Sequence, residues 1–134
     1  MTADEILAAA RTELGTPFQH HGRISRKALD CAGLAVLVAQ HWYTVAEPAA
    51  YGMHPSNGQL RQWIEAQDFL YPVSTPEAGD FMLMRFGVDP QHLAICAGAT
   101  MIHSYGMVGK VVEHRFNDVW RARVVQSYRF RGMT

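Results

Sequence analysis

The chain has 134 residues, of which 49% are hydrophobic, and its 12 basic and 12 acidic side chains give a formal net charge of zero. This length predicts a single domain, residues 1–134, with its own core, and the balanced charge provides no overall field that would favour nucleic acid or a membrane surface. No apolar run approaches a membrane span, the acidic start of the chain predicts no cleaved export signal, and two cysteines are too few for a disulfide framework.

Three helices are predicted in the first half of the chain. A capping box at 2–5 opens the first helix, whose apolar stripe ends at Gly15. The second helix runs from Cys31 to about Tyr43, with apolar residues at helical spacing. Another capping box at 56–59 opens the third helix, which reaches about Gln67.

After Pro72 the sequence changes to short apolar runs separated by turns, a pattern typical of strands. The predicted strands are 80–86, 92–97, 100–105, 110–115 and 124–130. Because the helices come first and the strands second, the sequence predicts an α+β domain.

Cys31 stands at the predicted start of the second helix. Unpaired N–H groups and the positive end of the helix dipole would there stabilise a thiolate, lower the pKa of the thiol and hold an oxyanion. The small residues Ala32 and Gly33 leave the approach to the sulfur open, and Gly33 lets a substrate or a second backbone come close. Asp30 is predicted to cap the helix or organise the loop, and its charge would raise the pKa of the thiol.

Two histidines downstream supply a base and its partner if Gly98 and Ala99 form a two-residue hairpin turn. His92 and His103 then become diagonal neighbours on one face of the sheet, roughly 7 to 8 Å apart between backbone positions. In this arrangement His103 accepts the Nδ1–H of His92, which leaves Nε2 of His92 free for the thiol of Cys31.

These residues also have structural interpretations. A lone cysteine in an apolar helix is usually core, and either histidine can serve as a surface or hydrogen-bonding group. Cys96 is interpreted as a small buried hydrophobe, since it lies on the order of 13 Å from His92 along a strand. The other histidines lack the spacing of a zinc site, so no metal or cofactor is expected; they are His20, His21, His41, His54 and His114.

The chain is locally basic from Lys110 onward. Two interpretations stay open for this segment. Arg121 and Arg123, like Arg129 and Arg131, are two residues apart and would project to one side of a solvated strand. The alternative is a docking patch for a partner or an anionic polymer.

Five segments occur in order along nearly the whole chain: Leu14-Gly15-Thr16-Pro17-Phe18, Leu29-Asp30-Cys31-Ala32-Gly33-Leu34, Glu77-Ala78-Gly79-Asp80-Phe81, His92-Leu93-Ala94-Ile95 and Met101-Ile102-His103-Ser104-Tyr105. Together they resemble the NlpC/P60 cysteine peptidases, which cleave peptidoglycan stem peptides. The resemblance implies a papain-like α+β fold, with N-terminal helices packed on a five- to six-stranded antiparallel sheet. It also implies that Cys31 is the nucleophile, His92 the general base and His103 the residue that orients the base. The implied scissile bond joins γ-D-glutamate to diaminopimelate.

Two parts of the chain look most like the tail-associated cell-wall peptidases of bacteriophages and related particles within that family. They are His20-His21-Gly22-Arg23 leading to Leu29-Asp30-Cys31, and Met101-Ile102-His103-Ser104-Tyr105 before an Arg-rich last strand. This resemblance implies an enzyme made in the host cytoplasm and carried in the virion tail tip to the host cell wall or periplasm. The implied partners are the peptidoglycan stem peptide and other tail-tip or baseplate hub proteins.

The chain departs from secreted members of the family at two supporting positions. Phe18 replaces a tyrosine that the family associates with the active site, and Ala32 replaces a serine associated with recognition of the free amine of the stem peptide. These departures put recognition of a free N-terminal amine in question.

Two further functions are compatible with the same residues. One is a structural tail-tip or assembly component whose peptidase site is vestigial or secondary. The other is acyl transfer by the thiol onto an amine instead of water.

Overall fold

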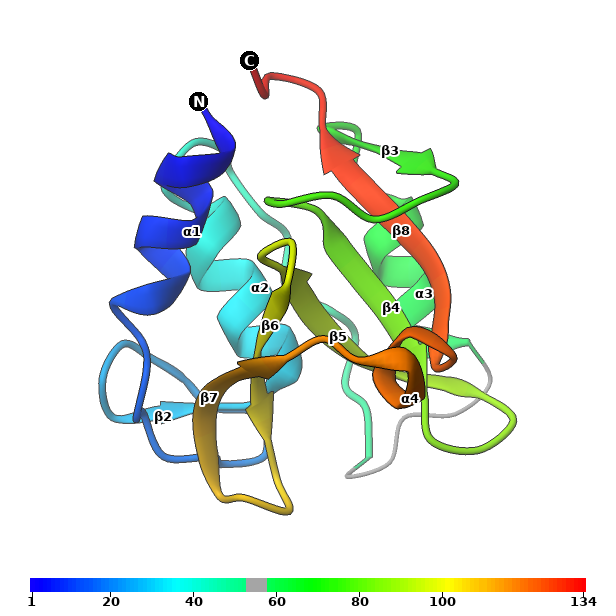
Figure 1. Cartoon of the computed structure of the whole chain (residues 1–134). Coiled ribbons are helices and arrows are strands. Elements are labelled where there is room, and N and C mark those ends of the chain that lie inside the picture. The colour runs from blue at the N-terminus through cyan, green and yellow to red at the C-terminus, as the bar shows by residue number, and fades with distance from the viewer. Residues whose placement is uncertain (53–57) are drawn as a thin grey trace.

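The computed structural model describes residues 1–52 and 58–134 and has two layers, helices on one side and a sheet on the other (Figure 1). The helices of the first layer are α1 (Ala3–Arg11), α2 (Cys31–Ala39) and α3 (Gln59–Glu65). The sheet contains β3 (Leu70–Val73), β4 (Phe81–Arg85), β5 (Pro90–Cys96), β6 (Thr100–Tyr105), β7 (Lys110–Arg115) and β8 (Val124–Phe130). Its strands are antiparallel and lie in the order β3-β8-β4-β5-β6-β7. The predicted α+β class is therefore confirmed.

The ends of the predicted helices differ from those in the structure. The capping box of α1 is present, since the N–H of Glu5 donates to Thr2 Oγ1 at 3.1 Å and the N–H of Thr2 donates to Glu5 Oε1 at 3.0 Å. However, α1 ends at Arg11 and α2 at Ala39, and each is followed by turns rather than by the further helical residues predicted. Two of the four residues of the capping box predicted for α3, Ser56 and Asn57, lie outside the described residues, and α3 begins after Gly58 as its N-cap, without a side-chain capping hydrogen bond.

Four short elements escaped prediction. The strands β1 (Arg23–Ile24) and β2 (Ala28–Leu29) pair as a small ribbon ahead of α2, and α4 (Asp118–Arg121) precedes β8. The strand β3 contains Pro72, which is tolerated because β3 lies at the edge of the sheet.

The hairpin between β5 and β6 has the predicted register. The N–H of Ala97 donates to the carbonyl of Thr100 at 2.9 Å, and Ile95 pairs with Ile102. Gly98 has a φ of 86°, the left-handed conformation required by a two-residue turn of this kind. This register makes His92 and His103 diagonal neighbours on one face of the sheet.

The two faces of the sheet bury different cores. One face packs against α1, α2 and α3 through a large cluster that includes Phe81, Leu83, Leu93 and Ile95. On the opposite face, a smaller cluster contains Met82, Met84, Ala94, Cys96, Met101 and Phe116, with Trp120 packed against it. Because strand side chains alternate, His92 and His103 share the second face, which α4 partly covers.

A buried ion pair connects the start of β4 to β8. Asp80 is fully buried, and both of its carboxylate oxygens accept hydrogen bonds from Arg129 at 2.8 Å. The guanidinium also contacts Glu77 at 3.1 Å. Arg129 is therefore not part of a freely solvated strand face.

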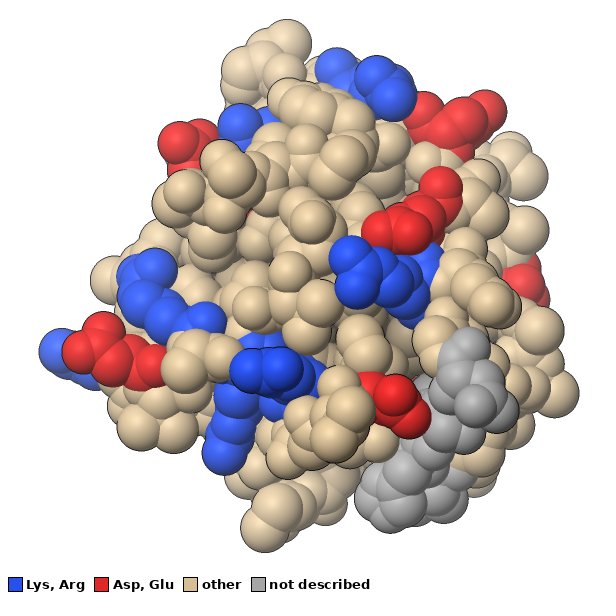
Figure 2. All heavy atoms as spheres, turned by 90° about the vertical axis from the view of Figure 1, so that its right-hand side faces the viewer, with Lys and Arg blue, Asp and Glu red and all other residues tan. Residues whose placement is uncertain are grey.

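Surface charges of both signs are mixed on the face shown in Figure 2, with no extended patch of one sign. In the C-terminal segment, Arg121 lies over the ring of Phe116, 4.2 Å from its centroid, and Arg123 lies over Trp120 at 4.4 Å. None of the helices formed by residues 1–52 and 58–134 is long and apolar enough to cross a membrane.

Candidate active site

A cavity of about 660 Å³ opens where the start of α2 meets the sheet. It is lined by Phe18, His20, Asp30, Cys31, Tyr51, Phe86, Gln91, His92, Ser104, Tyr105, Gly106, Met107 and Arg123. This volume is in the usual range for small-molecule and peptide-end sites. A smaller cavity of about 260 Å³, between β3, α4 and β8, is lined by neither cysteine nor histidine.

Cys31 is the first residue of α2, as predicted, and it is half-buried. The backbone N–H groups of Leu93 and Ala32 lie near its sulfur and favour the thiolate. Burial and then the negative charge of Asp30 oppose the thiolate more strongly, and they raise the pKa of Cys31 to about 12. The N–H group at the helix start does lower this pKa, as predicted, but the expected net lowering was wrong, because the sulfur is withdrawn from water and lies beside a carboxylate.

His92 is also kept neutral by its surroundings. Burial, and to a lesser extent the charge of Arg123, lowers the pKa of His92 to about 3. Its neighbour Leu93 contacts the sulfur of Cys31, and both Cys31 and His92 line the cavity. No hydrogen bond joins the thiol to the imidazole among the described residues. Cys31 is thus an uncharged thiol and His92 an uncharged base. A thiolate and an imidazolium would form only when the two side chains approach each other.

The predicted contact between the two histidines exists, with the ring nitrogens exchanged. Nε2 of His92 lies 2.6 Å from Nδ1 of His103. The sequence prediction had assigned Nδ1 of His92 to this contact and Nε2 to the thiol, so that assignment was wrong. Strand register determines which backbone positions are neighbours, whereas the orientation of each ring depends on packing around it.

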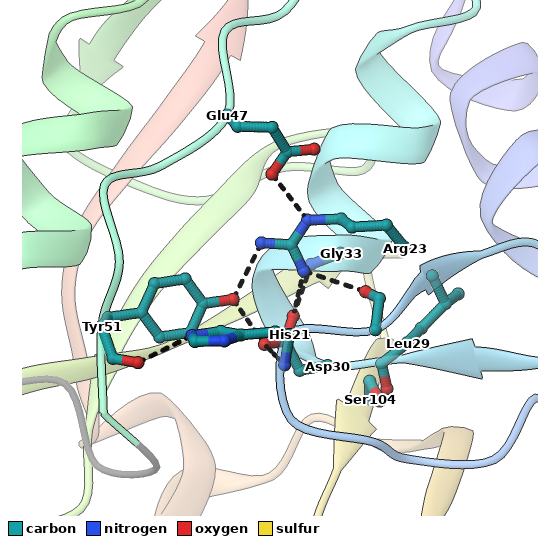
Figure 3. A network of polar contacts seen from close by, with 9 residues as sticks. His21, Arg23, Leu29, Asp30, Gly33, Glu47, Tyr51 and Ser104 are labelled. Atoms are coloured by element: carbon teal, nitrogen blue, oxygen red, sulfur yellow. Dashed lines mark hydrogen bonds and ion pairs between the residues drawn. The ribbon is translucent and has the colours of Figure 1, made fainter.

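Asp30 organises the loop before Cys31 (Figure 3). Its Oδ1 accepts the N–H of Gly33 at 2.8 Å, which caps α2, and a guanidinium N–H of Arg23 at 2.8 Å. Its Oδ2 accepts the backbone N–H of His21 at 2.9 Å and the hydroxyl of Tyr51. The predicted roles of Asp30, helix cap and loop organiser, are both confirmed.

Arg23 balances the charge of Asp30 from within the same network (Figure 3). Its guanidinium also donates to Glu47 at 2.8 Å and to the hydroxyl of Tyr51 at 2.8 Å. Burial opposes its charge, but the hydrogen bonds to Tyr51 and Glu47 outweigh burial and raise the pKa of Arg23. Because Asp30 is nearly enclosed, this permanent cation stabilises an otherwise costly buried carboxylate.

The remaining predicted residues, Gly33, Phe18 and Ala32, differ in whether they contact the cavity. A Cβ on Gly33 would lie 2.1 Å from the carbonyl oxygen of Gly22, so the predicted close approach is made by a second backbone. Phe18 lines the cavity. Ala32 is completely buried and does not line the cavity, so its side chain has no contact with that space.

The sequence predicted no site role for Arg23, which holds Asp30, and considered Arg123, which lines the cavity, only as part of the basic segment. His114 was considered only as a metal ligand, yet its Nε2 lies 2.8 Å from Nε2 of His103. Within residues 1–52 and 58–134, no three His, Cys, Asp or Glu side chains are grouped so as to hold a metal ion.

Solved structures that share this fold include several NlpC/P60 domains. The NlpC/p60 domain of the peptidoglycan hydrolase SagA aligns with 95% of this chain and 97% of its own length, with a TM-score of 0.64 and 21% identity. An NlpC/P60 family protein from Bacillus cereus aligns with 97% of this chain and 40% of its own, with a TM-score of 0.71 and 20% identity. The peptidoglycan hydrolase RipB from Mycobacterium tuberculosis aligns with 95% of this chain and 63% of its own, with a TM-score of 0.63 and 17% identity.

The fold is therefore that of NlpC/P60 domains, as the resemblance implied. The chain spans almost all of the SagA domain but less than half of the Bacillus cereus protein. No protein-family model and no curated protein matches the sequence.

The uncharged thiol predicts how alkylation of Cys31 depends on pH. Because burial raises its pKa to about 12, the reactive thiolate is scarce at neutral pH, and the rate with iodoacetamide should still rise through the alkaline range. The rate is measured by following the mass of the intact protein in a Cys96→Ala variant, in which Cys31 is the only thiol, and is compared with the rate of free cysteine at each pH. A rate that reaches its plateau in the acidic range would contradict the prediction, since it would show a preformed thiolate–imidazolium pair.

Proposed function

We propose that this protein is a cysteine peptidase that cleaves the stem peptides of peptidoglycan. The observation that carries the proposal is the cavity shared by Cys31 and His92, together with the contact of Nε2 of His92 with His103. A nucleophile, a base and a group that orients the base are the parts that acyl transfer requires. The NlpC/P60 fold, found in peptidoglycan hydrolases such as SagA and RipB, supports the same conclusion.

In the proposed reaction, Nδ1 of His92 takes the proton of Cys31 as the sulfur attacks the peptide carbonyl carbon. The C–S bond forms, the carbonyl oxygen becomes an oxyanion near the start of α2, and the C–N bond breaks as His92 returns the proton to the leaving amine. Water then hydrolyses the thioester, which releases the new carboxylate and restores the thiol. Since both groups start uncharged, proton transfer accompanies attack instead of preceding it.

Arg123 supports a substrate that carries a carboxylate. It lines the cavity, and its guanidinium is held between Trp120 and Phe86, 4.4 and 5.1 Å from their ring centroids. Its side chain has no carboxylate partner within the described part of the chain. A γ-linked D-glutamyl residue keeps its α-carboxylate free, so the proposed γ-D-glutamyl–diaminopimelate bond would bring an anion to this cation.

The polar network around Asp30 supports a substrate that does not need a free N-terminal amine. Both oxygens of Asp30 already accept two hydrogen bonds each, and Arg23 balances the charge. Ala32 offers no polar group and is buried. The enzyme is therefore proposed to act as an endopeptidase on stem peptides whose amino end is acylated, as it is in intact peptidoglycan.

The proposed setting is the tail tip of a bacteriophage, from which the domain would act locally on the host cell wall during DNA entry. The resemblance of the stretch from His20 to Cys31, and of Met101 to Tyr105 before the Arg-rich last strand, supports this setting. Other tail-tip or baseplate hub proteins would then be its partners. Copurification with intact virions tests the proposal, and a protein found only in the soluble fraction of the host would contradict it.

A second candidate function is a structural tail component with a vestigial site. The raised pKa of Cys31 and the missing hydrogen bond between its thiol and His92 favour this alternative. It predicts that the purified wild-type protein leaves every stem peptide intact.

Replacing the nucleophile gives the principal test. The Cys31→Ala variant should fold normally and lose all hydrolysis of an N-acetylated peptide containing the γ-D-glutamyl–diaminopimelate bond, because no other thiol lines the cavity. The products are identified by mass spectrometry, which also detects ligated peptides formed by acyl transfer. Cys96→Ala, a matched change at the other cysteine, should keep wild-type activity. Hydrolysis by Cys31→Ala would refute the mechanism.

Removing the cation of Arg123 tests the proposed carboxylate contact. Arg123→Gln should raise KM by roughly 10- to 100-fold, since a hydrogen bond to a charged group contributes about 1.5–3 kcal/mol. Arg121→Gln is the matched control, because Arg121 lies over Phe116 and does not line this cavity. A peptide whose α-carboxylate is amidated should bind wild type and Arg123→Gln alike, and a preserved difference between them would argue against the contact.

A further inference from the structure

Three histidines from three consecutive strands form a continuous hydrogen-bonded row, here called the histidine row: His92 on β5, His103 on β6 and His114 on β7. Nε2 of His92 lies 2.6 Å from Nδ1 of His103, and Nε2 of His103 lies 2.8 Å from Nε2 of His114. The row ends at the backbone, where Nδ1 of His114 lies 2.9 Å from the carbonyl oxygen of Arg115. His92 and His103 are buried, whereas His114 is partly exposed.

The carbonyl at the end of the row determines where each proton sits. A carbonyl oxygen only accepts, so Nδ1 of His114 carries a proton, and Nε2 of neutral His114 is an acceptor. Nε2 of His103 must then donate to it, which leaves Nδ1 of His103 as an acceptor. Nε2 of His92 therefore donates to His103, and Nδ1 of His92 is left unprotonated.

We propose that His114 is a positioning residue that, anchored on the carbonyl of Arg115, holds His92 in the tautomer able to take a proton from Cys31. The kinetic consequence rests on the proposed peptidase function, whereas the proton positions do not. His114 touches neither the cavity nor Cys31, and acts only through His103. A backbone carbonyl thus performs the role that a carboxylate performs in other triads.

A proton added to His114 reverses the direction of both hydrogen bonds between the rings of the histidine row. Nε2 of His114 then becomes a donor, so His103 must accept there and carry its proton on Nδ1, and His92 must accept on Nε2 and carry its proton on Nδ1. Burial lowers the pKa of His92 to about 3 and of His103 to about 2, so neither takes the first proton.

The groups that face His114 are few in the described structure. They are the ring of His103 from β6, the indole of Trp120 from α4 at 4.9 Å between ring centroids, and the carbonyl of Arg115 on β7 itself. The guanidinium of Arg123 also lies over the ring of Trp120. Among residues 1–52 and 58–134, no carboxylate hydrogen-bonds to His114.

Nuclear magnetic resonance of the imidazole nitrogens tests the proton positions without any substrate. Protonated and unprotonated ring nitrogens have well-separated ¹⁵N chemical shifts, and single His→Gln variants assign the three rings. At neutral pH, His92 and His103 should be protonated on Nε2, and His114 on Nδ1. Finding His92 protonated on Nδ1 while His114 is neutral would overturn the proposal, whatever the protein's activity.

Variants of His114 test the effect on the thiol. His114→Leu removes the acceptor for His103 and should lower kcat by about 10- to 100-fold, the usual loss for an outer partner of a functional histidine, with little change in KM. His114→Gln, whose amide oxygen accepts from His103, should restore most of that loss.

The matched control is His41→Leu, which makes the same change at an exposed histidine outside the row and should behave as wild type. If the wild type hydrolyses no peptide, the proposed function fails, and the rate of Cys31 alkylation replaces kcat as the kinetic readout for the row. A His114→Leu variant that folds and matches wild type in both rate and pH profile would overturn the positioning role.

Discussion

The carboxylate of Asp30 is the interaction on which the site depends. It caps α2 through Gly33, and an N-cap of this kind contributes about 0.5–2 kcal/mol to a helix. The same group holds the backbone at His21 and the hydroxyl of Tyr51, so three separate segments converge at the residue before the thiol. A buried carboxylate needs a counterion, and Arg23 supplies it. The arrangement that positions Cys31 therefore also places a negative charge beside it, which adds to the larger effect of burial in raising the pKa of the thiol.

The thiol and the two buried histidines of the site are uncharged, and a charged side chain lies beside them. Cys31, His92 and His103 are all held uncharged, chiefly by burial. Arg123 stands at one side of this uncharged region, over the rings of Trp120 and Phe86. Proton transfer between thiol and imidazole thus takes place in surroundings of low dielectric constant, where a fixed hydrogen-bonded partner such as His103 has a strong influence.

Much of the fold could be predicted from local patterns, since hydrophobic periodicity and turn residues reflect interactions between near neighbours in the chain. The two-residue turn at Gly98 was sufficient to place His92 beside His103. The same reasoning would have found His114. The strands β6 and β7 pair Tyr105 with Lys110 across a four-residue loop, which places Met101 opposite His114. Since Met101 and His103 are two residues apart on β6, His114 lies on the same face as His103.

Ring orientation and burial were beyond such reasoning. The nitrogen that His92 offers to His103 depends on side-chain packing, and the pKa of Cys31 depends on how far the assembled domain excludes water. The partners of Asp30 come from loops that are distant along the chain or lack periodicity, as Tyr51 shows. Short edge elements such as β3 carry too few residues for a recognisable pattern.

The fluorescence of Trp120 is sensitive to the charge of the histidines beside it. Its indole lies 4.9 Å from the ring of His114 and 5.2 Å from that of His103, between centroids. An imidazolium quenches indole emission on contact much more strongly than a neutral imidazole does. Fluorescence from this tryptophan consequently follows the ionisation of its histidine neighbours in unlabelled protein, and stopped-flow mixing can resolve how quickly that ionisation responds to a jump in acidity.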